Sequence, residues 1–307
     1  MPRPDGKEPS TMNQAEGLDR MMKERSNDPQ TPGGGRRRTR VIAVTGGKGG
    51  VGKSCVAVNL GLSLAMAGRD TLLLDADLGL ANVDVLLGLS PKCNIANLLA
   101  GDCRVEDLVL TAAHGLKVVP ATSGMRRMVD MSRAEYAAVI RAFDDYPEPP
   151  EYLIVDTAAG ISDSVSLFSV AADDVLVVVC DEPASLTDAY ALIKVLAREN
   201  GVQRFRVVAN MAYNPGHGRQ LFEKLERVTT RFLDVNLQFC GVVPHDDHLR
   251  RAVRRQMGVV DAWPGSPSAL AFKKLAMAAD NWEESPEALG RIGFFAERRM
   301  RRGEQAA

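Results

Sequence analysis

The 307-residue chain has almost no net charge, few aromatic residues and no long apolar run, and each absence excludes a class of protein. Its formal net charge is −1 and its aromatic share is 5%, so its composition gives no global reason to expect nucleic acid as a partner. No apolar run approaches the roughly 20 residues that a membrane span requires. The first ten residues, MPRPDGKEPS, lack the apolar stretch of a signal peptide. The five cysteines form no Cys-x-x-Cys pair, which disfavours structural zinc and a disulfide framework. We therefore expect a cytoplasmic protein.

The composition changes at about residue 40. Residues 1–39 end in SNDPQTPGGGRRRTR, whose proline, glycine and charge predict a flexible linker. Upstream, a short helix is predicted over about 10–25, where Thr11 and Gln14 fit a capping box and the apolar residues fall three or four apart. We expect one domain over 40–281, followed by a separate C-terminal segment over 282–307.

Between 40 and 281, short apolar runs alternate with amphipathic stretches. Runs such as VIAVT, DTLLLD, YLIVD and DVLVVVC predict strands that are buried on both faces. Stretches such as SCVAVNLGLSLAMAG and SLTDAYALIKVLAREN predict helices, with Gly68 and Gly201 at their C-terminal ends. This alternation predicts an α/β fold in which a mostly parallel, twisted sheet carries helices on both faces.

The stretch GKGGVGKS at 47–54 fits the phosphate-loop pattern G-x-x-x-x-G-K-[ST], directly between a predicted strand and a predicted helix. Its glycines let backbone N–H groups turn toward a phosphate at the positive end of that helix. Lys53 is expected to bridge the β- and γ-phosphates, and Ser54 to ligate Mg²⁺. The predicted ATP-binding residues of this P-loop NTPase motif are Gly47, Lys48, Gly49, Gly50, Val51, Gly52, Lys53, Ser54 and Cys55.

Three aspartates follow two of the predicted strands. Asp75 ends DTLLLD, Asp77 lies two residues further on, and Asp156 ends YLIVD. Because ligands of open α/β sheets bind outside the carboxyl ends of the strands, all three are expected to face the phosphate loop. We expect Asp75 and Asp156 to support Mg²⁺ together with Ser54, and Asp77 to act near the attacking water. Each of the three aspartates could instead cap a helix. For Asp84 we favour a helix cap or a surface position.

The expected nucleotide is ATP. Guanine specificity in such folds usually comes from Asn-Lys-x-Asp after a late strand, and VVANMAYN supplies Asn210 without the lysine or the aspartate. An adenine edge needs a donor–acceptor amide and an apolar slot, which Asn210, Pro244 and Asp246 could supply. ATP and Mg²⁺ are therefore the predicted cofactors.

The early lysine, Lys48, leads to a family. KGGVGKS resembles the deviant phosphate loop of the MinD/ParA/nitrogenase-iron-protein ATPases, and DADLGLANVD and DTAAG are similar to switch I and switch II of MinD. The resemblance covers about 41–260 and implies a homodimer formed with ATP, in which Lys48 reaches the phosphates of the other subunit. With Lys53 and Asp77, Lys48 would then be a catalytic residue, because an added cation offsets charge on the transferring phosphoryl group. A solvated loop lysine is the alternative.

The N-terminal stretch NQAEGLDR resembles the Asp-Gln-Ala-x-x-Leu-Arg activating helix of the FlhG/FleN group, the MinD-like regulators of flagellar number. It departs from that pattern at Asn13 and at Arg20, which comes one place late. The resemblance implies that Gln14, Ala15 and Leu18 contact an FlhF-type GTPase. It also implies flagellar switch (C-ring) proteins and a flagellar transcriptional activator as partners, and a location at the cell pole.

The C-terminal stretch SPEALGRIGFFAERRMRR begins with a cap at Ser285 and a proline at the first helical position. It predicts a basic amphipathic helix, which suits the inner face of the cytoplasmic membrane. A helix docked on its own domain is the alternative. The predicted membrane residues are Leu289, Ile292, Phe294, Phe295 and Met300.

These patterns together predict an ATP-dependent dimerisation switch that controls flagellar number and placement. A ParA-like ATPase that positions DNA or cargo would use RRAVRR at 250–255 for DNA, and the near-zero net charge argues against it. A MinD-type regulator of the division site is a further alternative. An iron–sulfur carrier of the same fold is disfavoured, because Cys93 and Cys103 lack the spacing expected of cluster ligands.

Overall fold

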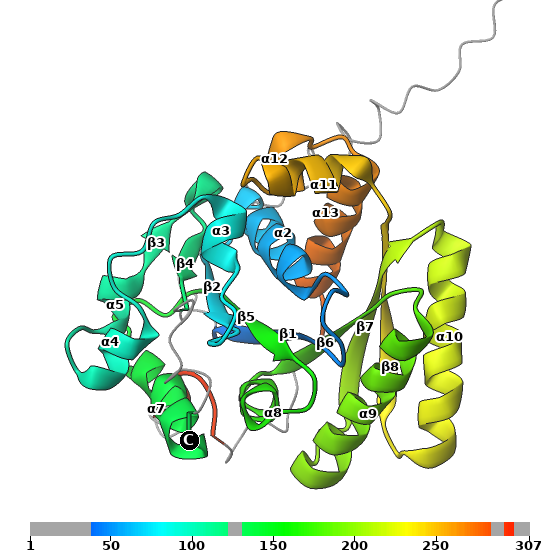
Figure 1. Cartoon of the computed structure of the whole chain (residues 1–307), viewed down its shortest axis with the longest axis horizontal. Helices are drawn as coiled ribbons and strands as arrows, with labels where there is room; N and C mark the ends of the chain where they lie inside the picture. The colour runs from blue at the N-terminus through cyan, green and yellow to red at the C-terminus, as the bar shows by residue number, and fades with distance from the viewer. Residues whose placement is uncertain (1–37, 122–130, 284–291, 298–307) are drawn as a thin grey trace, which may run out of the picture.

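A computed structural model describes residues 38–121, 131–283 and 292–297. Its centre is an eight-stranded sheet with the strand order β3-β4-β2-β5-β1-β6-β7-β8 (Figure 1). All neighbouring pairs are parallel except β3 and β4, which are antiparallel. The strands are β1 (Arg40–Gly46), β2 (Thr71–Ala76), β3 (Leu110–Thr111), β4 (Lys117–Val119), β5 (Tyr152–Ala159), β6 (Asp174–Val179), β7 (Arg204–Ala212) and β8 (Asn236–Pro244).

Helices cover both faces of this sheet, as the alternation predicted (Figure 1). The longer ones are α2 (Lys53–Met66), α7 (Arg133–Ala142), α8 (Asp163–Val170), α9 (Pro183–Asn200), α10 (Pro215–Phe232), α11 (Asp247–Arg254) and α13 (Pro267–Ala279). The shorter ones are α3 (Val83–Leu87), α4 (Ile95–Ala100), α5 (Val105–Leu108), α12 (Val259–Ala262) and the 3₁₀ turns η1 (Ala113–Gly115) and η2 (Phe143–Asp145). The C-terminal end of α9 is Gly201, with a φ of 69°, as predicted.

The two faces of the sheet bury alternate residues of the same strands. In β1, Ile42 and Val44 pack with α2, α12 and α13, whereas Val41 packs with α7 and α8. On the second face, β6 and β7 pack against α9 and α10. Burial on both sides explains the nearly continuous apolar runs of the central strands. The expected fold class is therefore confirmed.

The folded core extends beyond residue 281, the predicted end of the domain. The guanidinium of Arg206 lies 4.1 Å from the centre of the Trp282 ring. Arg40 donates to the carbonyl oxygen of Trp282 at 2.7 Å. Asp174 accepts a hydrogen bond from each of these two arginines at 2.8 Å. A buried cation–π and ion-pair cluster thus holds Trp282 at the amino edge of the sheet.

The predicted membrane residues Phe294 and Phe295 lie instead in the core, where they are 0% and 2% exposed. The ring of Phe294 meets Phe143 edge-on at 5.2 Å and stacks on Phe168 at 6.4 Å. Ile292 packs against the same cluster. Phe295 has a φ of 57°, which a continuous helix cannot contain.

The prediction that Ile292, Phe294 and Phe295 offer a lipid-facing surface is therefore wrong for this structure. The physical reason is that burying these rings in an apolar protein core or in a lipid interior gives a similar favourable free energy. The spacing of the apolar residues in the sequence therefore does not distinguish a core position from a membrane position. Leu289 and Met300 lie outside the described residues, as do Gln14, Ala15 and Leu18, so the structure does not place them.

Candidate functional site

The phosphate-loop motif forms a tight loop between β1 and α2, at the carboxyl edge of the sheet (Figure 1). Two of its glycines are required by close approach of neighbouring elements. A Cβ on Gly47 would come within 2.1 Å of the backbone of Asp188, and one on Gly52 within 2.3 Å of Asn210 Nδ2. Gly52 also has a φ of 89° and supplies no side chain to cap α2. The first N–H groups of α2 are thus left for a ligand, which is the arrangement that binds phosphate.

Lys53 begins α2 and is only 8% exposed. Its burial lowers the pKa of its amine, and Asp156 and Asp77 partly oppose this effect. Within the described part of the chain, Lys53 forms no ion pair at hydrogen-bonding distance. A buried cation of this kind favours the binding of an anion beside it. The geometry fits the predicted contact of Lys53 with phosphate.

Asp75 and Asp156 lie next to one another on paired strands, β2 and β5. Asp156 is 1% exposed, and neither of its carboxylate oxygens has a hydrogen-bond partner among the described residues. Burial raises the pKa of Asp156 well above its usual value, and the neighbouring Asp75 raises it further. Ser54 and Lys53 act in the opposite direction. An unpartnered buried carboxyl beside a serine and a second carboxylate is a donor set suited to Mg²⁺.

Asp75 has a second task that the sequence did not indicate. Its carboxylate accepts hydrogen bonds from the N–H groups of Asp77 (3.1 Å), Asn82 (3.0 Å) and Val83 (3.1 Å). Burial raises the pKa of Asp75 to about 7, although these bonds oppose the shift. Asp75 therefore fixes the loop that carries Asp77 and the start of α3. Asp77 itself is half-buried and accepts from Leu80 N at 3.1 Å.

No three side chains among His, Cys, Asp and Glu in the described ranges gather as an all-protein metal cage. Mg²⁺ usually binds proteins through one or two carboxylates, with a nucleotide and water supplying the other oxygens. Burial raises the pKa of the Cys55 thiol, in the first turn of α2, to about 11. Its expected contribution is its backbone N–H.

Asn210 connects the predicted base site to the phosphate loop. Its Nδ2 donates to the carbonyl oxygen of Val51 at 2.8 Å. Its Oδ1 is buried and has no hydrogen-bond partner among the described residues. The exocyclic amino group of adenine is a donor that would satisfy this oxygen. The motif did not reveal the clamp on Val51, because it joins residues 159 positions apart.

Asp246 is occupied by structural contacts. Its Oδ1 accepts a hydrogen bond from the backbone N–H of His248 at 2.8 Å. Its Oδ2 accepts from the backbone N–H of Ser268 at 3.0 Å and from the Ser268 hydroxyl at 2.6 Å. Burial alone would raise its pKa, but hydrogen bonds from Ser268 and His248 lower it to about 2. Asp246 therefore caps α11 and ties it to α13, which argues against the predicted contact with adenine.

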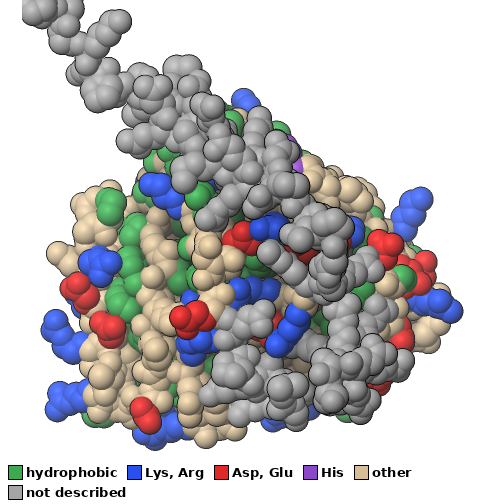
Figure 2. Space-filling view, turned by 180° about the vertical axis from the view of Figure 1, so that it is seen from behind, with side chains coloured by type: hydrophobic (Ala, Val, Ile, Leu, Met, Phe, Trp, Pro, Cys, Tyr) green, Lys and Arg blue, Asp and Glu red, His purple; other side chains and the backbone are tan. Residues whose placement is uncertain are grey.

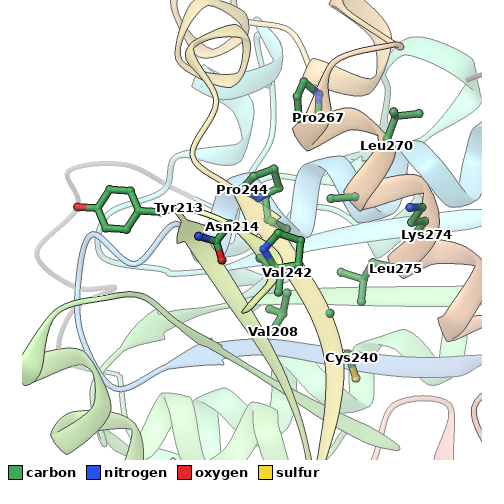
Figure 3. A pocket seen from close by; sticks show the side chains of 14 residues that line it. Val208, Tyr213, Asn214, Cys240, Val242, Pro244, Pro267, Leu270, Lys274 and Leu275 are labelled. Carbon is green, nitrogen blue, oxygen red and sulfur yellow. The ribbon is translucent and has the colours of Figure 1, made fainter. Parts of the chain in front are cut away.

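Pro244 lines a cavity of about 490 Å³ between the edge strand β8 and α13 (Figure 3). The cavity walls are mainly apolar and include Cys240, Val242 and Leu275, with Lys274 and Tyr213 also on the lining. None of the residues at 46–55 and neither Asn210 nor Asp246 lines it. The cavity is thus separate from the phosphate site, so Pro244 alone does not establish where a base would lie.

Lys48 lies on the exposed part of the loop and forms an ion pair with Glu182, which follows β6. The hydrogen bond from Lys48 to Glu182 raises the pKa of the Lys48 amine, despite some desolvation. The Lys48 side chain is 36% exposed, whereas Lys53 is 8% exposed. The structure thus separates the two lysines of the motif, one buried and one exposed.

The chain matches the family described as the CobQ/CobB/MinD/ParA nucleotide binding domain over residues 42–259. It is 55% identical over 258 residues to the antiactivator FleN of Pseudomonas aeruginosa, covering 84% of this chain and 92% of that protein. It is 33% identical over 245 residues to the flagellum site-determining protein YlxH of Helicobacter pylori, covering 80% and 82%.

Among solved structures, the septum site-determining protein MinD of Pyrococcus horikoshii, complexed with Mg-ADP, superposes with a TM-score of 0.67 at 25% identity. The match covers 80% of this chain and 97% of that one. The predicted MinD-like fold is confirmed, and the bound Mg-ADP of that relative supports ATP and Mg²⁺ as cofactors. Together with the phosphate loop and its aspartates, these comparisons show that the chain belongs to the MinD/ParA family of P-loop ATPases and, within it, to the FleN/FlhG group.

Proposed function

We propose that this protein is an ATP-dependent dimerisation switch that regulates the number and placement of flagella. The observation that carries the proposal is that the two lysines of the phosphate loop differ in exposure and in their partners. Lys53 is buried and feels the charge of Asp156, whereas the Lys48 side chain is 36% exposed and forms an ion pair with Glu182. An exposed cation at the edge of a phosphate site is available to a second molecule.

The chemistry assigned to these residues is phosphoryl transfer to water. Mg²⁺, held by Ser54 and Asp156 and oriented through Asp75, would neutralise charge on the phosphates. Lys53 and the N–H groups of α2 bind and orient those phosphates. Asp77, held by the loop that Asp75 fixes, positions the attacking water. Lys48 adds positive charge only when two subunits meet, so dimerisation controls turnover.

Three large apolar side chains that follow strands of the sheet are exposed. Leu80 follows β2, Ile161 follows β5 and Tyr213 follows β7, with exposures of 74%, 53% and 79%. They lie at the carboxyl edge of the sheet, where the nucleotide would sit. An apolar rim around a charged centre is suited to a second copy of the chain.

Two relatives carry the biological part of the proposal. One is named an antiactivator and the other a flagellum site-determining protein, which favour a transcriptional activator as partner and a role in placement. An FlhF-type GTPase and C-ring proteins are proposed from the N-terminal motif alone. A helix able to cross a membrane is absent from the described residues. Reversible membrane binding by the C-terminal segment would require Phe294 and Phe295 to leave the core.

The dimer is tested by measuring mass by light scattering with Mg-ADP and with a non-hydrolysable ATP analogue. We expect a dimer only with the analogue, and Ile161→Glu should prevent it while leaving nucleotide affinity within a few-fold. Val228→Glu is a matched control, since Val228 is 42% exposed on α10, away from the loop. A mass that does not respond to the analogue would refute the proposed dimer.

The flagellar role is tested by deleting the gene and counting flagella per cell. Complementation with the wild-type chain should restore the normal number, and complementation with Asp77→Ala should not. A deletion strain with an unchanged number and position of flagella would exclude this role without affecting the ATPase assignment.

A further inference from the structure

Helix α11 presents three arginines on its exposed side. At about 100° per residue, Arg250, Arg251 and Arg254 lie within a sector of about 100°, and Ala252, which is fully buried, lies on the opposite side. Arg250 is 3.6 Å from Asp247. Arg251 and Arg254 have no ion pair with any residue that the structure describes. The phosphate site uses none of these arginines, so its chemistry does not account for them.

Exposed apolar side chains lie directly beyond these arginines. After α11 the chain turns at Gln256, which has a φ of 56° and donates through Nε2 to Val85 O of α3 at 3.0 Å. Val85 is 55% exposed and Met257, next to Gln256, is 39% exposed. This hydrogen bond joins the end of α11 to α3, and both helices lie on the same side of the molecule as α12 (Figure 1). The region combines two arginines that have no ion pair among the described residues with two exposed apolar side chains.

We propose that Arg251, Arg254, Val85 and Met257, here termed the arginine surface, dock an acidic amphipathic helix of a partner protein. Carboxylates on such a helix would pair with the two guanidinium groups, because a guanidinium donates two parallel hydrogen bonds to a carboxylate in a bidentate geometry. The apolar stripe of the same helix would cover Val85 and Met257. One ligand would then contact both the arginines and the apolar side chains of the surface.

Charge and composition favour a protein over nucleic acid at this position. Binding of a phosphate backbone uses cations alone, so it would leave the exposed apolar side chains of Val85 and Met257 without a contact. A second copy of the chain is already assigned to a different face, the one around Leu80, Ile161 and Tyr213.

The arginine surface is connected to the nucleotide site through α3. The N–H of Val83, the first residue of α3, donates to Asp75 at 3.1 Å. A partner on this surface would thus contact an element whose start is held by a carboxylate of the site. The docking proposal itself does not depend on the proposed ATPase cycle, because it rests only on the charge and exposure of the surface.

The test uses the full chain and fluorescein-labelled 18-residue peptides. One peptide places glutamates on both sides of a leucine stripe, and the second replaces every glutamate with lysine. We expect fluorescence anisotropy to detect binding of the acidic peptide only. Arg251→Glu/Arg254→Glu should weaken that binding tenfold or more, and Val85→Asp should weaken it as well. Lys224→Glu/Arg227→Glu on the exposed side of α10 changes charge equally and should have no effect.

Three outcomes would overturn the proposal. The first is equal binding of the acidic and basic peptides, or no binding of either. The second is unchanged affinity in the Arg251→Glu/Arg254→Glu variant. The third is binding of a random DNA duplex, or of vesicles containing phosphatidylglycerol, that requires both arginines but survives Val85→Ser. That result would assign the surface to a polyanion instead of a protein helix.

Discussion

The amine of Lys48, in the phosphate loop, forms an ion pair with the carboxylate of Glu182, which lies between β6 and α9. Their side chains are 36% and 55% exposed, so the pair contributes little to stability. It has a consequence for mechanism, however. If Lys48 serves the nucleotide of the other subunit, it must exchange the Glu182 carboxylate for phosphate oxygens when the dimer closes.

This exchange predicts that Glu182→Gln promotes dimerisation. The variant removes the competing anion, so the dimer should form with the ATP analogue at a several-fold lower protein concentration, while nucleotide affinity of the monomer stays the same. Sedimentation velocity over a range of protein concentrations measures the shift. Asp181→Asn is the neighbouring control, since Asp181 pairs with His217 at 3.1 Å instead of Lys48. Dimerisation that is unchanged or weaker in Glu182→Gln would mean that the ion pair does not restrain Lys48.

Asp77→Ala is expected to bind ATP nearly normally, to hydrolyse it poorly and to accumulate as a dimer. Asp77 lies on the loop fixed by Asp75 and is not required for the Lys53 and α2 contacts to phosphate. A phosphate-release assay combined with light scattering measures both effects. Normal turnover in this variant would remove Asp77 from the mechanism.

The packing of Phe294 predicts a structural role for the C-terminal segment. Phe294→Ala should lower the free energy of unfolding by about 3–5 kcal/mol, because it leaves a cavity between Phe143 and Phe168. Phe232→Ala, at a residue that is 54% exposed, should lower it by less than about 1 kcal/mol. Urea denaturation compares the two. Similar values for both variants would show that residues 292–297 do not pack in solution as they do here.

Asp246 predicts a pH dependence of stability. Its pKa is lowered to about 2 in the folded protein, against about 3.9 in an unfolded chain. A depressed folded pKa stabilises the protein above about pH 4, and that stabilisation is lost as the pH falls from about 4 to about 2. Asp246→Asn should therefore cost roughly 2 kcal/mol at pH 7 and clearly less at pH 3.

The measurement is urea denaturation of both proteins at the two pH values. Asp247→Asn is the control, because the Asp247 side chain is 71% exposed. ATP affinity of Asp246→Asn should stay within a few-fold, since Asp246 is committed to His248 and Ser268. A large loss of ATP affinity with unchanged stability would restore Asp246 as a nucleotide contact.

Local patterns were sufficient to place the residues of the predicted phosphate site at one edge of the sheet. The glycines, Lys53 and the strand-ending aspartates lie at one edge because parallel strands end there. That Asp75 and Asp156 are direct neighbours depends in addition on the pairing of β2 with β5, which local patterns do not encode. The alternation of apolar runs likewise predicted the layers of the fold.

The remaining contacts depend on residues far apart in the chain. Three contacts each join separate elements of the fold: the hydrogen bond from Asn210 to Val51, the Lys48–Glu182 ion pair, and the contact of Arg206 with Trp282. The spacing of residues along the sequence does not predict such contacts. The burial of Phe294 was mispredicted because its helical pattern suits a protein core as well as a lipid surface. The position of Asp246 after β8 suggests a contact with adenine, but the hydrogen bonds from Ser268, 22 residues further along the chain, commit its carboxylate to a structural role.

The central claim is that Lys48 acts on the nucleotide of the other subunit, and Lys48→Ala tests it most directly. Nucleotide affinity of the monomer should stay within a few-fold of wild type, because Lys53, Ser54 and the N–H groups of α2 are untouched. Dimerisation with the ATP analogue should fail, since two phosphate-bearing faces would approach without bridging cations, and hydrolysis should fall with it. The measurement is sizing chromatography of Lys48→Ala with Mg²⁺ and the analogue, alongside its nucleotide affinity. A monomer that binds nucleotide is the predicted result, and a Lys48→Ala protein that still dimerises would contradict the account.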